Sequence, residues 1–534
     1  MNSHRPGRLQ ARALVSILAV LALVMGTSPA IAADDFHTYS GSTPLSVLAN
    51  GTVLKTRTVQ YSLSGIPLPL TVVQLLYRTT DAQGRPSANA TSIIQPPASA
   101  LTGPATQVVA YQSFYDSLNP EDGPSYALAG GNSGGTPVVH AETASVAGLL
   151  LAGHPVVMAD TQGATADFAA GPEYGRATVD SLRAVLASPA SNVSPTAKIG
   201  LLGYSGGAIG TNWAAVVAPS YAPDINERLV GAAEGGVLVV PDHNLDYISG
   251  STIWAGVLVM AFVGVSRAYD VPLRDYLNER GRQLLDDLDR APIGDVLGRY
   301  PGLTYESLAL PQHQDRTTIE PYVTTVNKLN LGQAPIPTIP MFVGQGTGGE
   351  AEGTQEHPTY GSGDGVMLAG DVRSLARRYC DADLPVQYRE YPASHVTTVP
   401  LWLPEAIAWL EARFDGTTSP PSSCGSIAAG NSLAPLPVPG NGSPMHPTDP
   451  SDGSGGGPGP DPTPASGGGD SPTPGSKTDA LAAGSGSGAG ANARDTLPGT
   501  GAPAIAGLLA LAWVCLAAGH LLWFRGRQNR WPAL

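Results

Sequence analysis

Residues 203–207 read Gly-Tyr-Ser-Gly-Gly, a G-x-S-x-G pattern with Ser205 at its centre. An apolar segment, residues 199–202, leads into this pattern, and a stretch of helix-forming residues, 208–217, follows it. This order predicts a strand, a sharp turn and a helix, the context that presents a serine hydroxyl as a nucleophile. The amide of Gly206 would then donate a hydrogen bond to the oxyanion that develops during acyl transfer.

A second match to the pattern, residues 131–135 with Ser133 at its centre, lacks this context. No apolar strand leads into it, and we expect no helix directly after it. We therefore predict Ser205 as the nucleophile and Ser133 as an ordinary loop residue.

A serine nucleophile of this kind needs a general base and a carboxylate that orients it, in the chain order serine, acid, histidine. His395 follows a predicted strand, 386–391, and precedes a predicted helix, 401–414, so we expect it in a loop that reaches Ser205. Asp364 follows the predicted strand 341–343 and a Gly-rich loop, and it is the preferred acid. The other histidines lie in the terminal segments, before Ser205, in a polar insertion or in a region interpreted below as a cap.

The elements that must position these side chains alternate between strand and helix patterns from about residue 34 to residue 416. Strands are predicted at 53–63, 70–96 with a turn at 81–84, 107–111, 155–159 and 198–202, and helices at 142–152, 174–188 and 208–217. Such alternation is typical of an α/β fold with a mainly parallel sheet that helices cover on both faces.

The alternation stops after residue 236 and resumes at residues 339–343. We interpret residues 237–330 as a helical cap inserted late in the sheet. Its apolar run, 253–265, is too short to span a membrane and is closed by Arg267, so we expect a core or lid helix.

Four blocks of this chain resemble the secretory lipases related to lipase A of Candida yeasts, over about residues 37–425. The blocks are Gly-Tyr-Ser205-Gly-Gly, Tyr115-Asp-Ser through Pro124-Ser-Tyr, Asp364 with Arg-Arg-Tyr-Cys380, and Tyr388-Arg-Glu-Tyr-Pro-Ala-Ser-His395. The resemblance implies an α/β-hydrolase fold with a helical cap, and cleavage of acyl esters of glycerol and related lipids.

The resemblance also implies roles for individual residues. Ser205, Asp364 and His395 would form the catalytic triad, and Asp116, beside the Gly206 amide, would belong to the oxyanion site. The chain departs from the family at Gly123, where relatives carry a cysteine, and in the long acidic loop before Asp364. We expect the cap run at 253–265 to line or cover an acyl pocket.

Three cysteines are too few for a disulfide scaffold. Cys380 and Cys424 should pair in an oxidising compartment, whereas Cys515 lies in a predicted anchor. No cluster has the spacing of metal ligands and no phosphate-binding loop is present, so we expect neither metal nor cofactor. Glu350, Glu352 and Glu356 are compatible with calcium, but a solvated loop is the favoured interpretation.

Residues 1–33 have the pattern of a secretory signal peptide: a basic start, an apolar run and Ala30-Ile-Ala32 as the cleavage site. This pattern predicts export and places the mature domain at residues 34–425. Residues 426–496 are rich in Pro, Gly, Ser, Thr and Asp, and we interpret them as a disordered spacer.

Residues 497–501 read Leu497-Pro498-Gly499-Thr500-Gly501 and resemble the LPxTG sorting signal of Gram-positive surface proteins. An apolar segment, 502–524, and a basic tail, 525–534, follow, as that signal requires. The resemblance implies sortase and peptidoglycan as partners, with Thr500 joined to the cell wall. A simple C-terminal membrane anchor is the alternative.

The composition restricts the function further. The 43 acidic residues outnumber the 29 basic ones, a net charge of −14, which argues against a nucleic-acid binder. We predict a surface-anchored carboxylic-ester hydrolase, a triacylglycerol lipase, that acts on a lipid ester. The alternatives are a serine peptidase or acyltransferase on the same fold, or an inactive lipid-binding module displayed on the wall.

Overall fold

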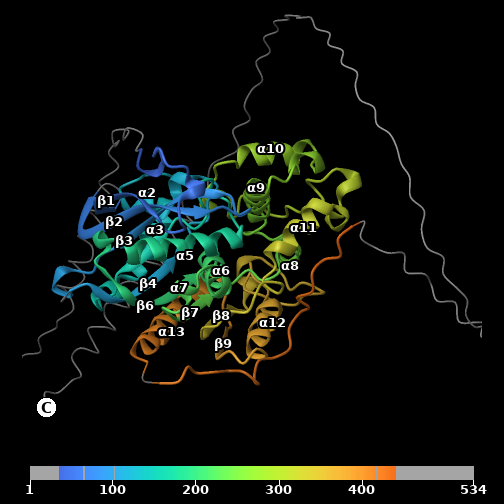
Figure 1. Cartoon of the computed structure of the whole chain (residues 1–534). Helices are drawn as coiled ribbons and strands as arrows, with labels where there is room; N and C mark the ends of the chain where they lie inside the picture. The colour runs from blue at the N-terminus through green and yellow to red at the C-terminus, as the bar shows by residue number, and fades with distance from the viewer. Residues whose placement is uncertain (1–34, 64–65, 101–102, 417, 440–534) are drawn as a thin grey trace, which may run out of the picture. The chain divides into compact units, whose positions relative to one another are not determined.

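The computed structural model describes residues 35–63, 66–100, 103–416 and 418–439 (Figure 1). The predicted signal peptide, sorting motif, apolar segment and basic tail, and most of the predicted spacer, lie outside these residues. Within the described ranges, no helix combines the length and the apolar composition that a membrane span requires.

Nine strands form one sheet in the order β1-β2-β3-β5-β4-β6-β7-β8-β9. Their bounds are β1 Val53–Leu63, β2 Ile66–Thr80, β3 Pro86–Ile94, β4 Ala105–Gln112, β5 Val156–Ala159, β6 Val193–Tyr204, β7 Leu229–Gly235, β8 Met341–Gly346 and β9 Val386–Tyr391. The first three strands and β5 pair antiparallel, and the six strands from β5 to β9 pair parallel. The predicted α/β class with a mainly parallel sheet is confirmed.

The hairpin of β2 and β3 closes at the predicted turn. Gly84 adopts a φ of +81°, which favours glycine, and the Asp81 carboxylate accepts hydrogen bonds from the N–H groups of Gln83 and Arg85 at 2.9 and 2.8 Å. The side-chain carboxylate thus satisfies backbone donors that the turn leaves unpaired.

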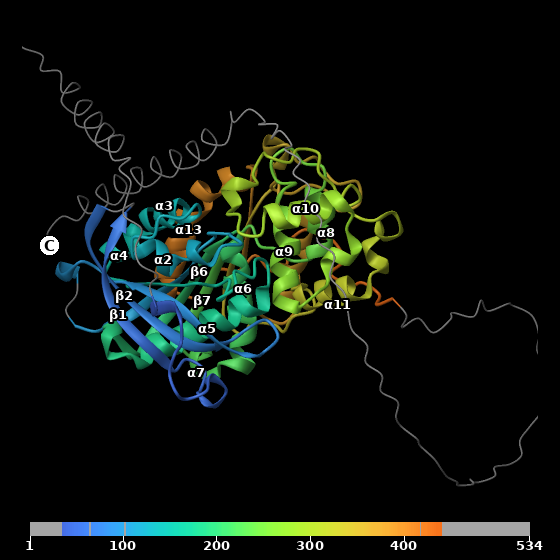
Figure 2. The same cartoon turned by 90° about the horizontal axis from the view of Figure 1, so that it is seen from above.

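Helices cover both faces of the parallel strands because successive side chains of each strand point to opposite faces. In β4, Val108 and Ala110 belong to one buried cluster, whereas Val109 and Tyr111 belong to another. The helices on the first face are α5 Gly171–Ala187, α6 Gly206–Tyr221 and α12 Ala369–Cys380. Those on the second are α2 Pro124–Leu128, α3 Thr136–Ser145, α4 Ala147–Leu151 and α13 His395–Asp415 (Figures 1 and 2).

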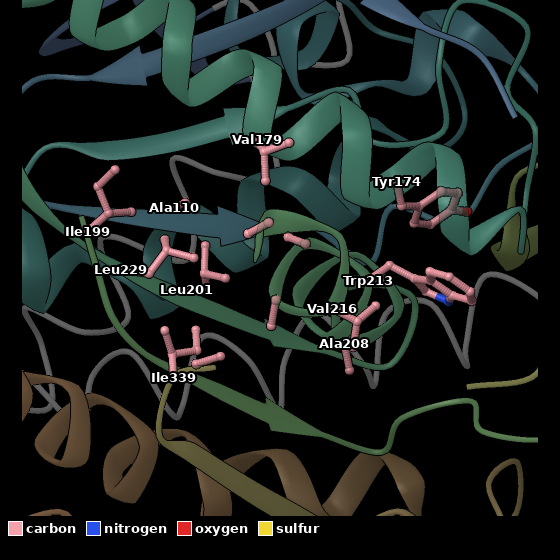
Figure 3. Close-up of a cluster of buried hydrophobic side chains, with 14 of the residues drawn as sticks. Ala110, Tyr174, Val179, Ile199, Leu201, Ala208, Trp213, Val216, Leu229 and Ile339 are labelled. Atoms are coloured by element: carbon pink, nitrogen blue, oxygen red, sulfur yellow. The ribbon is translucent and has the colours of Figure 1, made fainter. Parts of the chain in front are cut away.

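Figure 3 shows the cluster on the first face, which holds α6 against the sheet. Trp213 and Val216 of α6, Tyr174 and Val179 of α5, and Leu201 of β6 all belong to this cluster, and Trp213 lies near Tyr174. This packing fixes the start of α6, and with it the turn that carries Ser205.

The cap lies between β7 and β8, over the predicted range 237–330. Its helices are α8 Pro241–Ile248, α9 Val257–Tyr269, α10 Glu279–Asp287 and α11 Glu320–Leu329. The predicted apolar run lies largely on α9, which is the centre of a third buried cluster together with residues 366–368. The cap has its own apolar core and lies at the carboxyl ends of the parallel strands (Figure 2).

Residues 426–439 correct the predicted start of the spacer at 426. The side chain of Ile427 is 5% exposed and packs in the first cluster. Asn327 on α11 donates to the carbonyl of Leu436 and accepts from its N–H, at 2.9 and 2.8 Å. The domain therefore continues through residue 439, because scattered apolar residues in this Pro-rich stretch find buried sites.

Candidate active site

Ser205 occupies the turn between β6 and α6 with φ +54° and ψ −123°, a backbone conformation that non-glycine residues rarely adopt. The glycines at 203 and 207 permit this turn. A Cβ at Gly203 would overlap the carbonyl of Gly207, and a Cβ at Gly207 would overlap the carbonyl of Gln112. The predicted strand-turn-helix context of Ser205 is confirmed.

The structure brings Ser205, Asp364 and His395 together. His395 Nε2 lies 2.7 Å from Ser205 Oγ, and His395 Nδ1 lies 2.7 Å from Asp364 Oδ2. A carboxylate only accepts hydrogen bonds, so Nδ1 carries the proton and Nε2 is left to accept from the serine hydroxyl. This is the geometry that a serine nucleophile and its general base require.

Asp364 is fully buried in the loop between β8 and α12. Its Oδ1 accepts hydrogen bonds from the N–H groups of Val366 and Met367 at 2.9 and 2.7 Å, and its backbone carbonyl accepts from the N–H of His395. These contacts hold the carboxylate with Oδ2 turned to the imidazole.

His395 is the first residue of α13, which corrects the prediction of a loop followed by a helix from residue 401. Ser394 caps the helix through a capping box with Thr397. Pro400 and Pro404 lie inside the helix, where sequence reasoning expects an interruption. The phenol of Tyr204 donates to the carbonyl of His395 at 2.8 Å.

Burial alone would lower the pKa of His395, but nearby carboxylates outweigh it. The charge of Asp364 and its hydrogen bond, together with the charges of Glu352 and Asp116, hold the pKa of the imidazole above its ordinary value. The site therefore favours the imidazolium that forms when the histidine takes a proton.

Asp116 lies against Gly206 in the loop after β4, with a φ of +29°. Its Oδ1 accepts a hydrogen bond from Gln162 Nε2 at 3.4 Å, and the backbone N–H groups of Gly206 and of Asp116 itself act on the carboxyl group. Burial raises the pKa of this carboxyl to about 7, against the opposing effects of the His395 charge and these two N–H groups. The carbonyl of Asp116 accepts from the N–H of Ile293 in the cap at 2.9 Å.

Ser133 stands apart from this arrangement, and its hydroxyl donates to the carbonyl of Glu121 at 2.8 Å. The expectation that no helix follows it is wrong, because α3 begins at Thr136. No strand ends at Ser133, however, and its φ is not positive, so the backbone does not form a nucleophile turn.

A cavity opens on Ser205 and enters the cap. It is lined almost entirely by apolar side chains, and α9 contributes Val257, Ala261, Phe262 and Val265. Two phenols on the wall are held by hydrogen bonds to other residues of the cap. Tyr305 donates to the carbonyl of His313, and Tyr322 donates to Asp242. The cavity suits an apolar chain rather than a charged ligand.

Cys380 at the end of α12 is joined to Cys424 by a disulfide that closes a 44-residue separation. The favoured interpretation of the acidic loop as solvated holds for Glu350 and Glu356, which are exposed, but not for Glu352. Glu352 is 8% exposed and accepts from Trp254 Nε1 of the cap at 2.8 Å. Sequence reasoning missed Glu352 because an acidic residue among Gly and Glu looks like a surface residue.

In the described part of the chain, no cluster of His, Cys, Asp or Glu has a metal-binding arrangement.

The family model of the secretory lipases matches residues 131–421 of this chain. Lipase 1 of Candida albicans is 28% identical over 76% of this chain and 86% of its own length. A Mycobacterium tuberculosis protein named as a probable inactive lipase is 30% identical over 68% of this chain and 79% of its own length.

Solved structures give the same picture of the fold. Candida antarctica lipase A in its closed state superposes with a TM-score of 0.62 and 25% identity, over 74% of this chain and 90% of that one. The rice cell wall degrading esterase LipA from Xanthomonas oryzae shares the fold at a TM-score of 0.53 and 15% identity, over 70% of this chain and all of that one.

Proposed function

The chain belongs to the secretory lipase family, and from this membership we propose that it is a serine hydrolase of lipid esters, with triacylglycerols as the substrate class. One observation carries the proposal: the hydrogen-bonded Ser205, His395 and Asp364 lie at the mouth of an apolar cavity. The hydrogen bonds supply an activated nucleophile, and the cavity supplies a place for an acyl chain.

In the proposed reaction, Ser205 Oγ attacks the ester carbonyl carbon while His395 Nε2 takes the hydroxyl proton. Asp364 stabilises the resulting imidazolium, and the Gly206 N–H donates to the oxyanion. The tetrahedral intermediate collapses to an acyl-enzyme, and the alcohol leaves with the proton from His395. Water then attacks the acyl carbonyl carbon while His395 takes one of its protons. His395 returns this proton to Ser205 Oγ, which releases the fatty acid and restores the serine.

Because one relative is named as a probable inactive lipase, the main competing proposal is an inactive lipid-binding module. The triad geometry argues against it, because this chain keeps all three groups within hydrogen-bond distance. A peptidase or acyltransferase on the same fold is a second alternative, because the triad does not fix the leaving group. The apolar lining of the cavity favours lipid esters over peptides.

A substrate panel tests these alternatives. The purified domain, residues 34–439, is assayed with p-nitrophenyl esters of increasing chain length, a triacylglycerol emulsion and peptide amides. We expect hydrolysis of the esters and the triacylglycerol and none of the amides. Ester turnover that requires an added alcohol acceptor would identify an acyltransferase, and no turnover of any compound would identify an inactive module.

We also propose that the enzyme is exported and attached to the cell surface. The family description supports export, and residues 497–534 support attachment, since LPGTG, an apolar segment and an Arg-rich tail occur in the order of a sorting signal. Thr500→Ala should move the enzyme from muramidase-released wall material to the membrane or the medium. Extraction of the wild-type protein by detergent alone would instead indicate a simple membrane anchor.

A further inference from the structure

A second buried carboxylate, that of Glu352, lies at the imidazole of His395 in addition to Asp364. Glu352 ends the short 3-10 helix Gly349–Glu352, in the loop between β8 and Asp364. Its Oε1 accepts a hydrogen bond from the N–H of Val396 at 3.0 Å, and its Oε2 accepts from Trp254 Nε1 at 2.8 Å. Both oxygens face N–H donors, which suits the ionised carboxylate.

The two donors frame the histidine from different parts of the fold. Val396 follows His395 in the first turn of α13, so its N–H is one of those that a helix leaves unpaired. Trp254 belongs to the cap, and its ring meets the imidazole edge to face, with centroids 5.3 Å apart and an interplanar angle of 80°. Glu352 therefore joins the cap to the helix that begins with the histidine.

The surrounding loop is built closely around this carboxylate. Gly365 has a φ of +118°, and a Cβ there would lie 3.2 Å from both Glu352 Oε2 and Trp254 Nε1. The loop is attached on both sides of the triad: Thr354 Oγ1 donates to the carbonyl of Gly365 at 2.7 Å, and the N–H of Gly348 donates to the carbonyl of Ala393 at 2.9 Å. These hydrogen bonds hold the loop in place beside the triad.

Four titratable groups face His395 from the elements packed against it. Asp364 comes from the loop before α12, Glu352 from the loop after β8, Asp116 from the loop after β4, and Tyr204 from the end of β6. The charge of Glu352 acts on the imidazole in the same sense as that of Asp364, and both raise the pKa of His395. Glu352 does not touch the reacting atoms, so its action passes through His395.

We propose that Glu352 is a positioning residue for His395, which holds the first turn of α13 and the cap tryptophan around the imidazole and whose charge stabilises the imidazolium. This inference rests on the proposed hydrolytic function. It assigns Glu352 of the acidic loop a role in the chemistry, and it makes the contact with Trp254 of the cap part of the competent site.

The test compares Glu352→Gln with Glu350→Gln, an exposed residue of the same short helix, in the full domain. With a soluble ester as substrate, kcat and KM are measured from pH 5 to pH 9. Removing the negative charge lowers the pKa of His395, so the acid limb of kcat/KM should move to lower pH by about half to one unit in Glu352→Gln. The kcat should fall about tenfold with KM nearly unchanged, because the lost interaction acts in the transition state.

Glu350→Gln should match the wild type in both respects. If the acid limb of kcat/KM does not shift in folded Glu352→Gln, the inference is overturned, even if the activity falls. A residue with a merely structural role would lower the activity without moving the limb. Should Glu352→Gln fail to fold, Glu352→Asp and Trp254→Phe carry the test. Both keep the charge and lose a hydrogen bond, so kcat should fall severalfold while the limb stays in place, and wild-type kcat in both would overturn the inference.

Failure of the proposed function has a different signature. It would appear as a wild-type enzyme that hydrolyses no ester, whereas failure of this inference would appear as an active wild type and an unshifted Glu352→Gln.

Discussion

The carboxyl group of Asp116 rests on the backbone of Gly206, the residue that follows the proposed nucleophile. The Gly206 N–H lowers the pKa of this carboxyl, and a Cβ at position 206 would overlap the carboxyl oxygens. The N–H that is proposed to stabilise the oxyanion thus belongs to a residue that lies directly against a buried carboxyl group. This close approach explains why residue 206 is glycine.

Gly206→Ala should lower kcat/KM by about 100-fold, because the new methyl group displaces Asp116 and disturbs the oxyanion donor. Gly210→Ala, one turn further along α6, is the matched control, because its Cβ would meet the side chains of Gln112 and Thr161 at 3.0 Å or more and not Asp116. Kinetics on a soluble ester, with thermal unfolding to verify the fold, measure the difference. Equal losses in both variants would mean that the Asp116 contact has no special role.

The pH dependence should report the state of Asp116. Burial raises the pKa of its carboxyl to about 7, so it is neutral below that pH and ionised above it. A carboxylate beside a developing oxyanion opposes the transition state, and kcat/KM should therefore fall as the pH rises through about 7. Asp116→Asn stays neutral, so its pH profile should lack this alkaline fall. A fall that persists unchanged in Asp116→Asn would assign it to another group.

Much of this site could be predicted from the sequence because its signals are local. The apolar run into Ser205 and the helix-forming residues after it define the turn, and the chain order of acid and histidine then selects Asp364 and His395. Strand β7, Leu229–Gly235, is missing from the predicted elements, because its Ala and Gly have low strand propensity and only its burial between two strands makes it a strand.

The cavity predicts how chain length affects binding. Val257 lines the cavity, whereas Val263 on the same helix is buried but does not line it. Val257→Thr keeps the shape and adds a hydroxyl, so KM for long acyl chains should rise about tenfold with little change for acetate esters. Val263→Thr should lower thermal stability without changing the dependence on chain length. If KM changed equally for all chain lengths in Val257→Thr, the cavity would not be the acyl-binding site.

The disulfide should contribute stability rather than activity. Cys380 and Cys424 close a loop with a sequence separation of 44, which by chain entropy stabilises the fold by about 4 kcal/mol. The paired variant Cys380→Ser with Cys424→Ser should unfold at a lower denaturant concentration and keep the wild-type kcat at 20 °C. A large loss of kcat in the folded variant would show that α12 transmits strain to Asp364.

What the sequence could not supply depends on contacts between distant segments. Glu352 looks solvated in the sequence, yet its partners, Trp254 and Val396, lie 98 and 44 residues away and leave no local pattern. The start of α13 at His395 is hidden for a different reason, since Pro400 and Pro404 argue locally against a helix that tertiary packing then stabilises.

Ser205 should be the residue that forms the acyl-enzyme, and labelling with a fluorophosphonate followed by peptide mapping identifies that residue. We expect one phosphonylated residue, Ser205, in the wild type, full labelling of Ser133→Ala, and neither labelling nor ester hydrolysis in folded Ser205→Ala. Hydrolysis by Ser205→Ala at the wild-type rate, or a label on any other serine together with loss of activity, would contradict the account.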